Sequence, residues 1–176
     1  GLSRIGFEIG LVSAEQYNRV LEKYAAVEKE LDRLEHTHIA PGAQLSALLE
    51  AHGTADVRNG ASLAELVRRP QISYRDIAPF DKDRPALSHA ICDQVEIRLK
   101  YDGYIKRQLK QVEEFKKMEE RRLPDDIDYD NIVGLRLEAK EKLKKIRPDN
   151  FGQAGRISGV SPADVTVLMV YLESRR

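Results

Sequence analysis

Residues 13–36 read SAEQYNRVLEKYAAVEKELDRLEH, and this stretch decides the fold class. Ser13 and Gln16 have the spacing of a capping box, in which each side chain accepts a hydrogen bond from the other residue's backbone N–H. Apolar residues then recur at alternating spacings of three and four, at Tyr17, Val20, Tyr24, Val27, Leu31 and Leu34. Because this spacing returns to one side of a helix, it predicts an amphipathic helix over residues 14–36.

Shorter helical signals follow, separated by prolines and glycines. Ser62 with Glu65 and Ser73 with Asp76 repeat the cap spacing, and a proline ends each of the two helices that they begin. We predict an all-α fold with helices near residues 14–36, 44–52, 63–69, 74–79, 89–122, 136–146, 151–157 and 162–174, and with a loop at 54–61. The predicted domains are an N-terminal helical part, residues 1–88, and a second part, residues 89–176, which contains one long helix and a C-terminal bundle of two small helical hairpins.

One segment of the predicted long helix also fits a strand. From Val95 to Tyr101 apolar and charged residues alternate, and Asp102-Gly103 is a turn dipeptide, so a β-hairpin is the alternative. We prefer a helix because residues 108–122 have a helical pattern and no partner strand is evident. Gly103 inside a helix then predicts a close approach of another backbone, or a bend.

An internal repeat marks the C-terminal part. Ile132-x-Gly134-Leu135, followed by Leu143, recurs 25 residues later as Ile157-x-Gly159-Val160, followed by Leu168. In each copy a glycine turn precedes a helix whose apolar residue lies nine positions after the glycine. The repeat predicts two helical hairpins stacked on each other, and Ser161-Pro162 is typical of the start of the last helix.

Composition limits the class of protein. The chain has 176 residues, of which 41% are hydrophobic and 33% are charged, with 29 Lys and Arg against 29 Asp and Glu. This is typical of a charge-rich globular chain and excludes a disordered one. Residues 140–176 include eight basic residues and only four acidic ones, so we expect any polyanion-binding surface there.

Several other classes of protein or site are not expected. A single cysteine, Cys92, cannot form an intramolecular disulfide, which favours a reducing cytoplasm. The one close histidine pair, His36 and His38, has no evident third ligand, so no metal is expected. The longest apolar stretch, near residues 165–172, is too short to span a bilayer, and no leader peptide opens the chain. No nucleophile, base and orienting group can be assembled, so we expect no catalysis by this chain alone.

The order of motifs along the chain carries a family resemblance. The motifs are Leu66-x-Arg68-Arg69-Pro70, Gln94-Val95-Glu96-Ile97, Lys100-Tyr101-x-Gly103-Tyr104-Ile105, Gly134-Leu135, Arg156-Ile157-Ser158-Gly159-Val160-Ser161-Pro162-Ala163 and Leu168-Met169-Val170-Tyr171-Leu172. They resemble the C-terminal end of the MnmG (GidA) family of tRNA-modifying enzymes, over nearly the whole chain. Arg136-Leu137 departs from the family, which usually has Ser and a polar residue there.

The resemblance implies a function as well as a fold. In the family, a flavin-binding domain precedes this region, so FAD is expected in the full-length enzyme and no cofactor in this chain, which has no Gly-x-Gly-x-x-Gly. The C-terminal domain contacts tRNA and a GTPase partner, MnmE. Together with the basic excess, this predicts tRNA binding by Lys140, Lys144, Lys145, Arg147, Gln153 and Arg156, with 140, 144 and 147 on one helical face. Partner binding is predicted for Tyr101, Gly103, Tyr104 and Arg107.

Two other functions remain open. The chain could be a purely structural module whose helices only dock proteins. It could also be a double helix-hairpin-helix module that binds DNA, as the two glycine turns suggest, although Ser161 replaces the second glycine that such hairpins usually carry.

Overall fold

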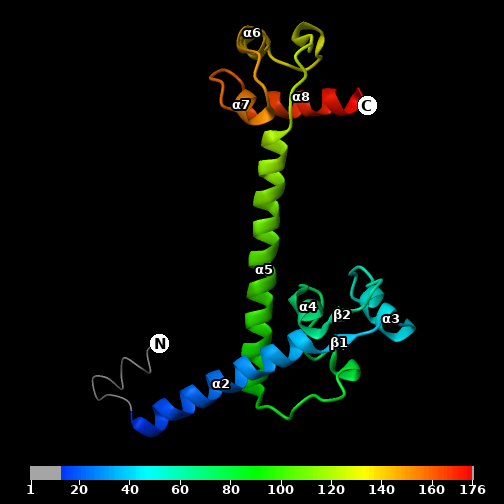
Figure 1. The fold of residues 1–176 in the computed structure, drawn as a ribbon, viewed down its shortest axis with the longest axis vertical. Coiled ribbons are helices and arrows are strands. Elements are labelled where there is room, and N and C mark those ends of the chain that lie inside the picture. Colours follow the sequence, from blue (N-terminus) through cyan, green and yellow to red (C-terminus); the bar gives the residue numbers. More distant parts are fainter. Residues whose placement is uncertain (1–12, 176) are drawn as a thin grey trace. The chain divides into compact units, whose positions relative to one another are not determined.

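The computed structural model describes residues 13–175. The chain divides into two compact units, Gly1–Arg107 and Gln108–Arg176, and each has an apolar core of its own. The division falls inside helix α5, His89–Glu120, whose course along the chain can be followed in Figure 1. The predicted domain boundary between residues 88 and 89 stays a prediction, because compactness does not show which part folds independently.

Unit 1 begins with helix α2, Ala14–His36, and its predicted capping box is confirmed. The Gln16 N–H donates to Ser13 Oγ at 3.2 Å, and the Ser13 N–H donates to Gln16 Oε1 at 3.2 Å. The apolar stripe of α2 is buried only in its second half, where Val27 and Leu34 enter the core.

The other elements of unit 1 wrap the same core. They are β1 (His38–Ile39), α3 (Ala43–Ala51), β2 (Ala61–Ser62), α4 (Leu63–Arg68), the 3-10 helix η1 (Ala78–Phe80) and the first part of α5. The predicted helices near 44–52 and 63–69 are confirmed, and the Ser62–Glu65 capping box forms. Leu45 and Leu49 of α3, Leu63 and Leu66 of α4, and Val95 and Leu99 of α5 are fully buried or nearly so.

Two local predictions in unit 1 are wrong. Residues 74–79 do not form an α-helix but a series of turns followed by η1. Ser73 and Asp76 do bond reciprocally, yet Pro79 disfavours the helical conformation at Ala78 before a second turn can form. Within the predicted loop, Ala61 pairs with Ile39 in the short antiparallel ladder of β1 and β2. The sequence does not reveal these strands, because two residues are too few to show the alternation of apolar and polar side chains that marks a strand. Over residues 13–175 the fold is nevertheless all-helical, apart from this ladder and an isolated antiparallel bridge between Arg122 and Asn150.

The ambiguous segment of α5 is helical. Val95 and Leu99, four residues apart, are both buried, which is the period of a helix face. Gly103 lies on the same face, and a Cβ at this position would overlap the main-chain oxygen of Arg68. The predicted close backbone approach at Gly103 is therefore confirmed.

Unit 2 contains the predicted repeat. After α5 come η2 (Tyr129–Asn131), α6 (Leu137–Ile146), α7 (Phe151–Gly155) and α8 (Pro162–Ser174). Gly134 and Gly159 have φ of 101° and 97°, the left-handed region that favours glycine, and each precedes a helix. Leu143 and Leu168, nine residues after their glycines, are both fully buried. The two hairpins thus share one core, as the repeat predicts.

Candidate nucleic-acid and partner surfaces

Lys140 and Lys144 of α6 face an acidic loop, residues 125–131. Lys144 Nζ lies 2.8 Å from Asp130 Oδ2, and this carboxylate raises the pKa of the Lys144 ammonium. Lys140, one turn earlier, donates from Nζ to the main-chain oxygen of Asp130 at 3.3 Å. Two of the three lysines predicted to bind tRNA therefore already contact oxygens of their own chain.

Arg147 also contacts this loop, but from beyond the C-terminal end of α6. It caps α6 at its C-terminal end with φ of 51°, so it does not continue the helical face of Lys140 and Lys144. Its guanidinium donates to the main-chain oxygens of Ile127 at 2.8 Å and Asp125 at 3.2 Å, and lies 5.3 Å from the ring centre of Tyr129. The predicted i, i+4, i+7 alignment is wrong at its third position. All three residues nevertheless converge on the loop, and we call them the loop-facing cations.

The remaining residues predicted to bind tRNA lie elsewhere on unit 2. Lys145 and Arg156 are exposed, and their side chains make no hydrogen bond or ion pair with residues 13–175. Gln153 accepts at Oε1 from the Asp149 N–H at 2.8 Å, which stabilises the start of α7. Lys145 and Arg156 are thus the members of the predicted set whose side chains have neither a hydrogen-bond nor an ion-pair partner among residues 13–175.

The residues predicted to bind a partner separate onto two sides of α5. Tyr101 and Tyr104 are 62% and 53% exposed. Gly103 and Arg107 instead face α4, where Arg107 Nη1 donates to the main-chain oxygen of Arg68 at 3.2 Å. The side chains of the two tyrosines are exposed, whereas Gly103 and Arg107 both contact the main chain of α4.

Sequence reasoning missed the lysine that completes this contact. Lys100 Nζ donates to the main-chain oxygens of Val67 at 2.7 Å and Arg69 at 2.5 Å, and also to that of Ile72. Burial lowers the pKa of this ammonium. The carbonyls at a helix C-terminus have no partner in their own helix, and a cation there is favourable. Lys100 therefore caps α4 from outside.

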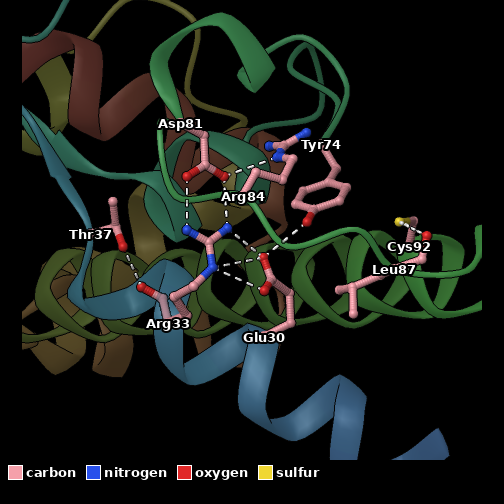
Figure 2. Close-up of polar contacts among 8 residues, drawn as sticks. All are labelled: Glu30, Arg33, Thr37, Tyr74, Asp81, Arg84, Leu87 and Cys92. Atoms are coloured by element: carbon pink, nitrogen blue, oxygen red, sulfur yellow. Dashed lines mark hydrogen bonds and ion pairs between the residues drawn. The ribbon is translucent and has the colours of Figure 1, made fainter.

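A buried ion cluster between α2 and the segment before α5 was also missed (Figure 2). Arg33 bridges two carboxylates, with Nη2 at 2.6 Å from Glu30 Oε1 and 2.7 Å from Asp81 Oδ2. Arg84 Nε lies 2.9 Å from Asp81, and the Tyr74 hydroxyl donates to Glu30 at 2.9 Å. Burial of Asp81 opposes its ionisation, but the two guanidiniums outweigh burial and lower its pKa.

This ion cluster holds the segment before α5 against α2. Burial, reinforced by the bond to Glu30, raises the pKa of Tyr74 far above its ordinary value, so its proton is not available near neutral pH. The charges are paired with each other, as buried charges must be, and they attach residues 74–84 to α2. The spacing of Glu30 and Arg33 on one helix side could have suggested an ion pair, whereas Asp81 is 48 residues from Arg33 and carries no local signal.

A second ionic contact joins the two hairpins of unit 2. The buried Asp164 carboxylate accepts from the Ser161 N–H at 2.9 Å, lies 2.8 Å from Arg136 Nη2, and accepts from the Arg136 N–H at 3.3 Å. Burial opposes ionisation of Asp164, but these donors outweigh it and hold the pKa well below its usual range. Arg136, where the sequence departs from the family pattern, is thus satisfied by the second hairpin.

Metal and membrane sites can be assessed for the described residues. Among residues 13–175, no three His, Cys, Asp or Glu side chains are grouped to hold a metal ion. His36 contacts Asp32 and His52 lies 3.9 Å from Asp76, so neither lies in a ligand set. In the same part of the chain, no helix is long and apolar enough to cross a membrane.

Two family descriptions match the chain along nearly its whole length. Residues 14–109 match the tRNA modifying enzyme MnmG/GidA C-terminal helical domain, and residues 111–176 match the MnmG/GidA C-terminal helical bundle. The chain belongs to the MnmG/GidA family. The adjoining limits of the two matches lie close to the division between units 1 and 2.

Individual members of the MnmG/GidA family are similar in sequence to this chain. The tRNA uridine 5-carboxymethylaminomethyl modification enzyme MnmG of Lachnoclostridium phytofermentans is 50% identical over 175 residues, and that of Caldicellulosiruptor saccharolyticus is 46% identical over 175 residues. Each match covers 99% of this chain and 28% of the relative. GidA of Aquifex aeolicus, in its form II crystal, is 37% identical, with a TM-score of 0.47 over 97% of this chain and 26% of that chain. The chain thus spans about a quarter of the length of these relatives.

Proposed function

We propose that this MnmG/GidA domain is a non-catalytic part of a flavin-dependent enzyme that modifies the wobble uridine of tRNA, and that it binds tRNA and an MnmE-type GTPase. The observation that carries the proposal is the pair of adjoining family matches, which together extend from residue 14 to residue 176. The names of the relatives supply tRNA as the substrate class. The whole enzyme acts in the bacterial cytoplasm on this account.

Cations of unit 2 support tRNA binding. Lys145 and Arg156 are exposed without a neutralising partner among the described residues, and Lys144 is 46% exposed at its side chain. Contacts from such side chains to phosphate are largely independent of sequence and fix the position of the nucleic acid. We therefore expect similar affinity for different tRNA species.

The cofactor of the family would lie outside this domain. A flavin-binding turn needs closely spaced glycines between a strand and a helix, so that a backbone N–H cradle meets the pyrophosphate. Of the positive-φ glycines among the described residues, Gly134 and Gly159 belong to helical hairpins, and Gly53 and Gly60 lie between α3 and the two-residue strand β2, so none forms such a turn. The described residues do not fit FAD, and no step of flavin chemistry is assigned to them.

A competition experiment tests the nucleic-acid part. Labelled tRNA is titrated with the 176-residue chain at low salt, and unlabelled tRNA or duplex DNA of equal phosphate content is added. Our account expects tRNA to compete better than DNA. Stronger competition by DNA would favour the helix-hairpin-helix alternative, and no binding of either nucleic acid would favour a module that only docks proteins.

The exposed tyrosines of α5 support the partner part of the proposal. Large aromatic side chains that remain exposed on a helix are typical anchors of protein interfaces, and Ile97, 56% exposed, lies beside them one turn away. We place the GTPase contact on Tyr101 and Tyr104 and leave Gly103 and Arg107 to the packing of α4.

The tyrosine contact is tested by Tyr101→Ala with Tyr104→Ala in the full-length enzyme. We expect at least a tenfold loss of affinity for the GTPase, measured by calorimetry, because interface aromatics carry a large share of binding energy. Tyr24→Ala removes an equally exposed tyrosine, 60% exposed, from α2 and serves as the control. Unchanged affinity in the double variant would contradict this placement.

A further inference from the structure

Asp130 supplies oxygens to both lysines of the loop-facing cations. Its carboxylate lies 2.8 Å from Lys144 Nζ, and its main-chain oxygen accepts from Lys140 Nζ at 3.3 Å. The two lysines lie one helical turn apart, and the Lys144 ammonium pairs with an anionic oxygen, as it would with a phosphate oxygen. The Asp130 carboxylate is thus an anion of the chain itself that is paired with a lysine predicted to bind tRNA.

The loop does not depend on the Asp130 carboxylate for its place. Ile127 and Tyr129 are 1% and 2% exposed and lie in the core of unit 2, and Arg147 holds the main-chain oxygens of residues 125 and 127. The side chains of Lys144 and Asp130 are 46% and 59% exposed, and exposed ion pairs of this kind are weak. The carboxylate can therefore leave Lys144 while the loop stays folded.

We propose that the Asp130 carboxylate is a built-in anionic competitor, and that tRNA phosphates reach Lys144 by displacing it. The inference rests on the proposed function. Binding at this face then exchanges the Asp130 carboxylate for another anion. A single anion gains little binding free energy from this exchange, whereas a polyanion with several adjacent phosphates gains enough to displace the carboxylate. Asp130 lowers the affinity of this face and selects polyanions over isolated acids.

Asp130→Asn tests the inference because it keeps the shape of the side chain and removes its charge. We expect the variant to bind tRNA roughly 2- to 5-fold more tightly than the unaltered chain, as the loss of a weak competing ion pair implies. Glu114→Gln, an exposed carboxylate of α5, makes the same change of net charge and is the control.

A double-mutant cycle separates competition from a general charge effect. Lys144→Ala should weaken tRNA binding more in the Asp130→Asn background than in the unaltered chain. In that background Lys144 is not paired with a carboxylate at residue 130, so its removal costs more of the binding. Equal gains from Asp130→Asn and Glu114→Gln, or no coupling in the cycle, with tRNA binding intact, would overturn the inference alone. Absence of tRNA binding by the unaltered chain and the Asp130→Asn variant would contradict the proposed function and the inference together.

Discussion

Single residues of α5 have roles that neither composition nor exposure alone would assign. Gly103 sits where the helix contacts the main chain of Arg68, and the Lys100 ammonium caps the carbonyls beside it. Both belong to motifs that identify the family, yet the structure gives them packing roles. Resemblance to a family therefore marks residues that matter without saying whether they bind a ligand or support the fold.

Gly103→Ala is the sharpest test at this scale. The added methyl overlaps the Arg68 oxygen, which belongs to the backbone and cannot move aside cheaply, so we expect unit 1 to lose about 1 to 3 kcal/mol of unfolding free energy. Urea denaturation followed by circular dichroism measures the loss. Asp102→Ala, at the exposed neighbouring position, should stay within about 0.5 kcal/mol. Equal stability of both variants would show that α5 and α4 do not pack as closely as described.

At the scale of elements, local patterns predicted the helices well. The capping boxes at Ser13 and Ser62 and the glycine turns before α6 and α8 involve residues within a few positions of each other, so the sequence shows them directly. The helix predicted over 74–79 failed because the cap signal there was followed too soon by Pro79. A local capping signal predicts a helix reliably where no proline lies in the helix's second turn.

The candidate site could be predicted only in part. The run of lysines on α6 is visible in the sequence, but its contact with the loop at Asp130 joins separate elements and depends on how unit 2 packs. Arg147 leaves the helix in a left-handed conformation that is uncommon for a residue other than glycine. Spacing along a helix cannot reveal either feature, because both arise from tertiary contacts.

The link between the two hairpins predicts a dependence of stability on pH. Asp164→Asn should lower the unfolding free energy of unit 2 by roughly 1 to 2 kcal/mol at neutral pH, since charge-assisted bonds to Arg136 and Ser161 are weakened. The folded-state pKa of Asp164 is depressed, so its contribution is complete above the ordinary carboxyl pKa and declines as the pH falls towards the folded value.

Urea denaturation of both proteins across the acidic range measures this contribution. The stability difference between the unaltered chain and Asp164→Asn should be constant from about pH 5 to 8 and should shrink below about pH 4. Glu141→Gln, an exposed carboxylate of α6, should show a much smaller difference at every pH. A difference that grows on acidification would contradict the assigned ion pair.

For the whole molecule, the proposed function is binding, with no flavin chemistry assigned to this domain. The isolated chain should purify without colour above about 400 nm, because the part of it that the structure describes, residues 13–175, offers no cradle for the pyrophosphate of FAD. Absorbance spectroscopy after gel filtration with added FAD is the measurement. A stoichiometric yellow cofactor that survives gel filtration would require a flavin site in this domain.

Binding of tRNA as a function of salt tests the central claim most directly. The affinity of the 176-residue chain for tRNA is measured by filter binding at several salt concentrations, for the unaltered chain and for Lys144→Ala with Arg147→Ala. The double variant should bind more weakly to every tRNA species, and the magnitude of its log K against log salt slope should fall by roughly 1 to 2.

Two controls make the result decisive. Lys23→Ala with Lys29→Ala removes two exposed lysines of α2, in unit 1, and should leave the slope unchanged. Circular dichroism should show intact helicity in every variant. Affinity and slope that stay unchanged in the Lys144 and Arg147 double variant, with helicity intact, would show that these cations only hold the acidic loop and would contradict tRNA binding at this face.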